Sequence, residues 1–172
     1  MVAGGVADRA RLFEILETVK DPEVPVLSVV ELGVVRDASF DDAGAVEVRI
    51  TPTYSGCPAM GAIEADITAA LHAAGYADVR VRTVFQPAWT SEWIGPVARE
   101  KLRAYGIAPP GRPATGEDDL IPLLRRGAAI AVACPYCGST RTELRSEFGS
   151  TSCKSILYCN GCEQPFEQFK AI

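Results

Sequence analysis

The chain has 172 residues, 48% of them apolar and 23% charged, which is enough for one ordinary domain and a small second one. Its formal net charge of −5 argues against a protein that binds nucleic acid or anionic membranes over a broad surface. The first residues lack the pattern of a secretory signal, and no apolar stretch is long enough to span a bilayer. We therefore expect a cytoplasmic protein, in which cysteines are more often metal ligands, catalytic groups or core residues than disulfides.

The first part of the chain predicts a small domain in which helices and strands alternate. Apolar residues recur at helical spacing in the helices and at every second position in the strands. The predicted elements are, in chain order, a helix that ends before Asp21–Pro25, strands over 33–40 and 45–51, a helix over 58–74, a strand over 78–85 and a helix that ends near residue 105. This α-β-β-α-β-α order indicates an α+β protein whose first domain has two layers, a sheet with helices on one face.

Cys57 stands alone between Gly56 and Pro58, far from the other five cysteines. Proline suits the first position of a helix, so Cys57 is the expected N-cap of the helix that follows. A thiol at that place faces unpaired N–H groups and the positive end of the helix, which favour the thiolate. The residues alone leave two interpretations open, a reactive thiolate or a small buried residue at a strand-to-helix corner.

A segment rich in proline, glycine and acidic residues separates the first part of the chain from the last. We expect a domain over residues 1–106, a linker over 107–128 and a small second domain over 129–172.

The last part carries two Cys-x-x-Cys pairs, Cys134 with Cys137 and Cys159 with Cys162, separated by 21 residues. This spacing is typical of a structural zinc site, in which four thiolates leave no open position for catalysis. Strands between and after the pairs predict a small all-β zinc ribbon. A unit of about 40 residues seldom folds alone, and bound zinc can supply on the order of 10–16 kcal/mol. Four thiolates also suit iron or an iron–sulfur cluster, so the spacing leaves the metal open.

Cys153 lies outside both pairs. It is either a buried thiol between strands or an additional ligand or reactive thiol whose pKa the adjacent Lys154 lowers.

Three motifs in order, DPEVPVLSVVELGVVRD, VRITPTYSGCPAM and VRVRTVFQPAWTSEW, resemble the SufT-like iron–sulfur assembly domain over about residues 9–106. Together with KLRAYGIAPP, CPYCGS, FGSTSCKSILYC and CEQPFEQFK, they make nearly the whole chain resemble the PaaD family of the phenylacetyl-CoA epoxidase system. The resemblance implies an accessory protein of phenylacetate degradation, which helps to assemble an iron or iron–sulfur centre in the oxygenase or reductase subunit. The sequence has neither a Glu-x-x-His pair nor a glycine-rich dinucleotide motif, so we expect no epoxidation on this chain itself.

The resemblance also implies a role for Cys57, with Glu23 nearby, in holding iron or a cluster transiently before its transfer. One thiolate cannot retain a cluster alone, which implies a homodimer or a site shared with a partner. The alternative is a non-catalytic scaffold, in which the zinc ribbon bridges the other proteins of the complex.

Overall fold

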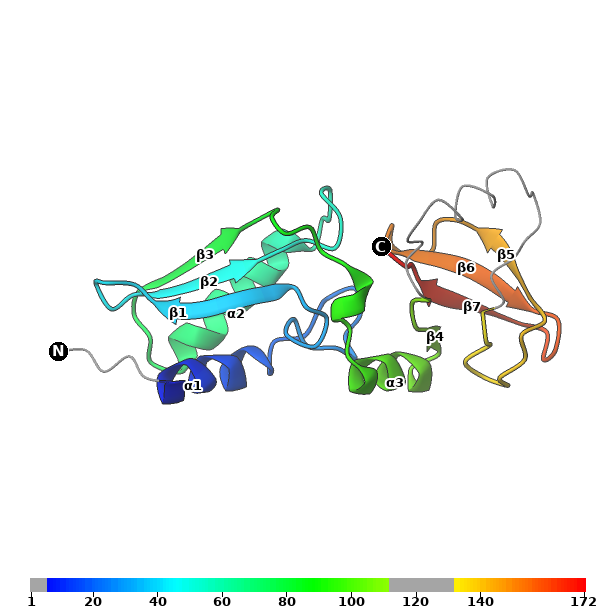
Figure 1. The fold of residues 1–172 in the computed structure, drawn as a ribbon, viewed down its shortest axis with the longest axis horizontal. Coiled ribbons are helices and arrows are strands. Elements are labelled where there is room, and N and C mark those ends of the chain that lie inside the picture. The colour runs from blue at the N-terminus through cyan, green and yellow to red at the C-terminus, as the bar shows by residue number, and fades with distance from the viewer. Residues whose placement is uncertain (1–5, 112–131) are drawn as a thin grey trace. The chain divides into compact units, whose positions relative to one another are not determined.

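The computed structural model describes residues 6–111 and 132–172. The chain divides into two compact units, Met1–Trp89 and Thr90–Ile172 (Figure 1).

The first unit holds helices α1 and α2 and a three-stranded sheet. Its elements are α1 (Val6–Leu16), β1 (Val35–Phe40), β2 (Val46–Ile50), α2 (Met60–Ala73) and β3 (Val79–Thr83). The strand order is β1-β2-β3, with β1 antiparallel to β2 and β2 parallel to β3. Helix α2 is the crossover between the two parallel strands. The predicted order of elements and the α+β class are confirmed.

In β2, apolar and charged residues alternate, and the apolar ones form part of the core of the first unit. Val46, Val48 and Ile50 are buried, whereas Glu47 and Arg49 point to the opposite face. Helix α1 contacts α2 and β1, and α2 contacts β3, so the helices cover the apolar face. The polar face of the sheet carries charged side chains instead.

The second unit begins with a short 3₁₀ turn and a helix and continues as a four-stranded sheet. Its elements are η1 (Ser91–Trp93), α3 (Pro96–Ala104), β4 (Ile107–Ala108), β5 (Thr142–Ser146), β6 (Lys154–Cys159) and β7 (Gln164–Phe169). The strand order is β4-β7-β6-β5, with β6 antiparallel to both β5 and β7 and β4 parallel to β7. The small core contains Ala108, Cys134, Leu157, Cys159 and Phe166.

The division into units differs from the expected domain boundary at residue 106. It falls between Trp89 and Thr90, so α3 groups with the second unit. Residues 107–108, expected to begin a linker, form β4, and Ala108 is fully buried against the ribbon core. The expected linker from residue 112 onward lies outside the described residues. Within the described ranges, no helix is both long and apolar enough to cross a membrane.

Candidate metal centres

The four paired cysteines lie on two tight turns of the second unit. Cys134 opens the first turn, where its carbonyl accepts the N–H of Gly138 at 2.9 Å and Gly138 takes a positive φ of 73° that suits glycine. Cys159 ends β6, and its carbonyl accepts the N–H of Glu163 at 2.8 Å in the turn that leads to β7. Each turn therefore holds its two thiols on one side.

The four sulfur atoms converge on a single point. All of them lie within 4.8 Å of one another. The Sγ atoms of Cys134 and Cys162 are 3.7 Å apart, and those of Cys137 and Cys159 are 3.6 Å apart. A tetrahedral ion with metal–sulfur bonds of about 2.3 Å places its sulfurs about 3.8 Å apart. The predicted site of four cysteines thus has the size and shape that a four-thiolate metal requires.

The electrostatics of this cluster fit a cation at its centre. Burial raises the pKa of the Cys159 thiol, but the N–H groups of Cys162 and Gly161 and the neighbouring thiols lower it to about 6. Burial and the three neighbouring thiols raise the pKa of Cys162 to about 12. Four sulfurs this close cannot all carry charge without a cation between them, and a bound metal removes that conflict.

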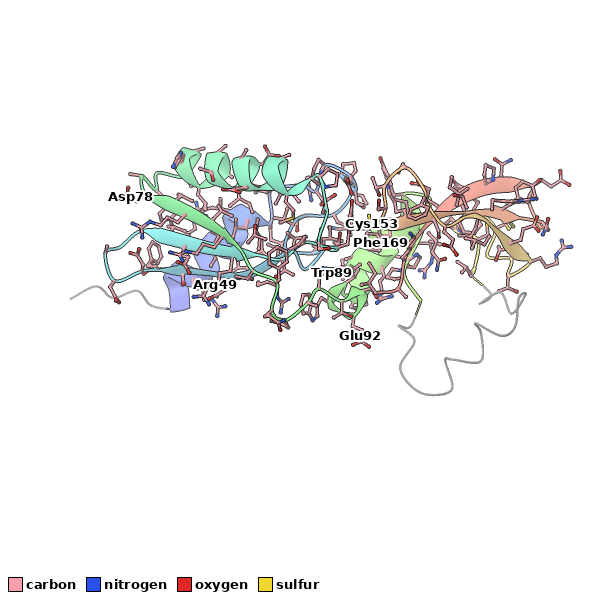
Figure 2. The ribbon with its side chains drawn as sticks, turned by 90° about the horizontal axis from the view of Figure 1, so that it is seen from above. Arg49, Asp78, Trp89, Glu92, Cys153 and Phe169 are labelled. Carbon is pink, nitrogen blue, oxygen red and sulfur yellow. The ribbon has the colours of Figure 1, made fainter. Side chains whose placement is uncertain are left out.

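Cys153 belongs to a different place in the second unit. It precedes β6, whereas Cys159 ends that strand, so the two are separated by roughly 20 Å of extended chain. Cys153 is buried, its sulfur lies 3.1 Å from the hydroxyl of Thr151, and Figure 2 shows it near Phe169. The ammonium of Lys154 lies 3.3 Å from a carboxylate oxygen of Glu167. Of the two interpretations, this position favours the buried thiol over a further ligand of the four-cysteine site.

A second group of residues, around Cys57, lies in the first unit. One part of it is the segment after α1, a loop that several hydrogen bonds hold in place. The carboxylate of Asp21 accepts the N–H groups of Glu23 and Val24, each at 2.8 Å. The N–H of Asp21 donates to the carbonyl of Leu27 at 3.1 Å, and Lys20 bridges Ser28. These bonds hold the carboxylate of Asp21 inside the turn, and Glu23 follows it two residues later in the same turn.

Cys57 lies in the segment between β2 and α2. Its N–H donates to the carbonyl of Tyr54 at 3.1 Å. The prediction that Cys57 is the N-cap of the following helix is wrong: α2 begins at Met60 and its N-cap is Ala59. Pro58 is part of a turn that precedes the helix. The rule that places proline at the first helical position named the correct segment but set the helix start two residues early.

The protonation state of Cys57 also differs from the expectation. The pKa of its half-buried thiol is raised, mainly by burial and further by the negative charges of Glu23 and Asp21. Hydrogen bonds from the N–H of Ala59 and the hydroxyl of Thr53 lower it only in part. The free protein thus holds Cys57 as a thiol, not as the thiolate that a helix end favours.

The charge effects on Cys57 also indicate which residues lie in its surroundings. The carboxylates of Asp21 and Glu23 are close enough to Cys57 for their charges to reach its sulfur. Among the described residues, only the four paired cysteines bring three or more metal-binding side chains within ligand distance of one another, so Cys57 and the two carboxylates do not form a complete metal site by themselves.

Two further residues of the first unit, Trp89 and His72, differ in their exposure to solvent. Trp89 is buried, and its indole N–H donates to the carbonyl of Leu32 at 3.0 Å, which fixes the chain after β3 beside the turn before β1. His72, the only histidine, is exposed on α2. The residues around Asp21 alone indicated no more than a turn, because the approach of these carboxylates to Cys57 depends on the tertiary fold. The expectation that Glu23 lies near Cys57 came from the family resemblance.

Comparisons with known proteins match both parts of the chain. Residues 9–83 match the family of iron-sulfur cluster assembly proteins, and residues 122–170 match the PaaD zinc beta ribbon domain. The chain is 42% identical over 161 residues to a protein of Escherichia coli (strain K12) that is described as a subunit of a "Putative 1,2-phenylacetyl-CoA epoxidase". That similarity covers 94% of this chain and 92% of the relative.

Two further relatives resemble the first unit. An Fe-S protein maturation auxiliary factor, YitW, of Bacillus subtilis (strain 168) is 34% identical over 88 residues, which are 51% of this chain and 85% of the relative. The crystal structure of a domain of unknown function, DUF59, from Bacillus anthracis has a TM-score of 0.52 and 31% identity, and the match covers 56% of this chain and 92% of that one.

Proposed function

The chain belongs to the PaaD family of 1,2-phenylacetyl-CoA epoxidase proteins, and from this premise we propose that it is a maturation factor, which delivers iron or an iron–sulfur centre to an oxygenase or reductase subunit. One observation carries the proposal. Within a unit that matches iron–sulfur assembly proteins, the half-buried Cys57 lies within electrostatic reach of Asp21 and Glu23.

The cluster suits a transient rather than a permanent metal site. In the free protein the thiol of Cys57 is protonated, and binding of Fe²⁺ converts Cys57–SH and Fe²⁺ into a Cys57–S–Fe bond and a released proton. The carboxylate of Glu23 supplies a hard oxygen ligand and a negative charge that attracts the cation. One thiolate and few carboxylates leave coordination positions open, so a client's own ligands can take the metal over.

The four cysteines of the second unit have a different role in this proposal. They bind one zinc ion, which stabilises the ribbon and supplies no open coordination position. The sulfur atoms of Cys134 and Cys162 form one edge of the tetrahedron around it, and those of Cys137 and Cys159 form the opposite edge. Iron that is passed on is cargo, whereas this zinc stays.

The test is to co-express the protein with the epoxidase oxygenase and reductase subunits and to measure iron in the purified client. We expect Cys57→Ser to lower the client's iron content while the variant keeps its zinc and its thermal unfolding curve. Ser55→Ala, two residues away and exposed, is the matched control and leaves client iron unchanged. Normal iron in the client with Cys57→Ser contradicts the carrier role.

A second candidate function is a scaffold that bridges the other proteins of the complex. It is favoured by large exposed side chains in the second unit, Tyr136, Leu144 and Phe148, each more than half exposed. This function predicts that Cys57→Ala has no effect, whereas Cys134→Ser or Cys159→Ser prevents the complex from forming. Size-exclusion chromatography of the co-expressed proteins separates the two candidates.

A further inference from the structure

The polar face of the β1-β2-β3 sheet carries a concentration of arginine that the proposed function does not use. In Figure 2, Arg49 lies on the side of the sheet away from α2. The strand register pairs Arg49 of β2 with Arg82 of β3 on that face. On the neighbouring strand β1, the residue opposite Arg49 is Asp37. The two arginines are thus neighbours fixed by the strand pairing.

One carboxylate holds both of these arginines. The Nε atom of Arg49 lies 3.0 Å from Oε1 of Glu47, and the Nε atom of Arg82 lies 3.0 Å from Oε2 of the same residue. Glu47 is the less exposed partner, with 18% of its side chain exposed against 52% for Arg49 and 63% for Arg82. Each arginine meets Glu47 through its Nε atom. The terminal guanidinium nitrogens of Arg49 and Arg82 are therefore not used in these two ion pairs and can donate to another acceptor.

The arginine pair borders a concave surface of a size that accepts a ligand. The concavity has a volume of about 450 Å³ and is lined by Arg36, Asp37, Glu47, Arg49, Arg82, Val84, Gln86 and Pro87. Small-molecule sites are typically about 300–1,000 Å³. The site is larger than an inorganic phosphate needs.

The charges around this concavity favour an anion. Its lining holds three arginines, Arg36, Arg49 and Arg82, against the carboxylates of Asp37 and Glu47, and Arg9 approaches Asp37 at 2.7 Å from outside the lining. The formal excess of the lining is one positive charge, in a protein whose net charge is −5. Planar guanidinium groups match the oxygens of phosphate in paired hydrogen bonds.

We infer that this surface is a binding site for a phosphate-type anion, with Arg49 and Arg82 as its paired donors and Glu47 as the residue that positions them. Free phosphate or pyrophosphate and the diphosphate of a nucleotide-like molecule share this chemistry. The size of the concavity favours the larger ligand. The site is independent of Cys57 and of the four-cysteine cluster.

The alternative is that these residues form only cross-strand ion pairs, which are worth little on an exposed surface and bind nothing. Arg80 provides the matched control. It lies on the same strand two residues before Arg82, has a similar side-chain exposure of 57%, and is paired with Asp41 at 2.7 Å. Arg80 is outside the concavity.

The experiment titrates the full-length, zinc-loaded protein at low salt with inorganic phosphate, pyrophosphate and ADP, by calorimetry and by NMR of the arginine Nε–H groups. We expect saturable binding of pyrophosphate or ADP, with shifts at Arg49 and Arg82. The double variant Arg49→Gln, Arg82→Gln weakens binding at least about tenfold, as the loss of charge-assisted hydrogen bonds requires. Arg80→Gln leaves binding within about twofold of the original protein.

Tighter binding of ADP than of pyrophosphate identifies a nucleotide-like ligand, and equal binding identifies a diphosphate alone; both support the site. Absence of saturable binding in the original protein overturns it. Equal weakening by Arg80→Gln also overturns it, because a general attraction to positive charge then explains the result. Thermal unfolding of each variant checks that the sheet is intact.

Discussion

The two cysteine centres of this chain differ in how they are built, and the difference separates a stabilising site from a transferring one. In the second unit, four sulfurs lie within 4.8 Å of one another on two rigid turns and form a complete shell. In the first unit, a single half-buried thiol lies near two carboxylates, and its pKa is raised. A complete shell retains its metal, whereas an incomplete one can receive and release it.

The largest effect should follow from removing a ligand of the complete shell. We expect Cys159→Ser to abolish stoichiometric zinc binding and the cooperative unfolding of the second unit, since structural zinc supplies on the order of 10–16 kcal/mol. Metal analysis and differential scanning calorimetry measure both. Cys153→Ser is the control, because that cysteine is buried in the same unit but outside the shell. It should keep its zinc and lose only about 1 kcal/mol, and loss of zinc there would break the distinction between the two thiols.

A glycine in each region gives a smaller and more specific comparison. A Cβ at Gly161 would lie 2.8 Å from both side-chain atoms of Ser139 and 3.3 Å from the sulfur of Cys159, whereas a Cβ at Gly56 meets nothing closer than 3.7 Å. We expect Gly161→Ala to destabilise the ribbon by about 1–3 kcal/mol and to weaken zinc binding in a chelator competition. Gly56→Ala should change the free energy of unfolding by less than about 0.5 kcal/mol. Equal effects would mean that the two turns are packed alike.

The charges beside Cys57 give a third test, with the smallest effect. Glu23 raises the pKa of Cys57, so Glu23→Gln should lower that pKa and increase the thiolate fraction at a given pH. The rate of alkylation by iodoacetamide at pH 8 should therefore rise, by less than about tenfold. Iron binding should fall in the same variant, because a ligand has been removed. Glu14→Gln, exposed on α1, is the control and should change neither quantity. A slower alkylation rate with Glu23→Gln would show that the carboxylate does not act on the thiol as described.

Much of this architecture could be predicted from the sequence because the determining interactions are local. Alternation in β2 and the helical spacing in α2 indicated the order of elements, and the paired cysteine spacing predicted the four-sulfur cluster. What could not be predicted depends on contacts between distant segments. The carboxylates that oppose ionisation of Cys57 come from a loop more than 30 residues earlier in the chain, so that only the family resemblance, and no local pattern, placed Glu23 near this thiol. The pairing of Arg49 with Arg82 depends on the register of two strands. The strand β4 was missed because two residues carry too little pattern to be distinguished from a linker.

The central claim is that Cys57 binds iron transiently while the four-cysteine cluster keeps its zinc. The most direct test is an anaerobic titration of the zinc-loaded protein with Fe²⁺, followed by the thiolate-to-iron absorption band and by metal analysis. In the original protein we expect iron to bind weakly at Cys57, and in Cys57→Ser we expect no iron to bind. Both proteins should contain one zinc per chain. Because the pKa of Cys57 is raised, the thiol is protonated at neutral pH, so the affinity for iron should rise by about tenfold for each pH unit up to that pKa. Iron binding that survives Cys57→Ser, or that displaces the zinc instead, would contradict the account.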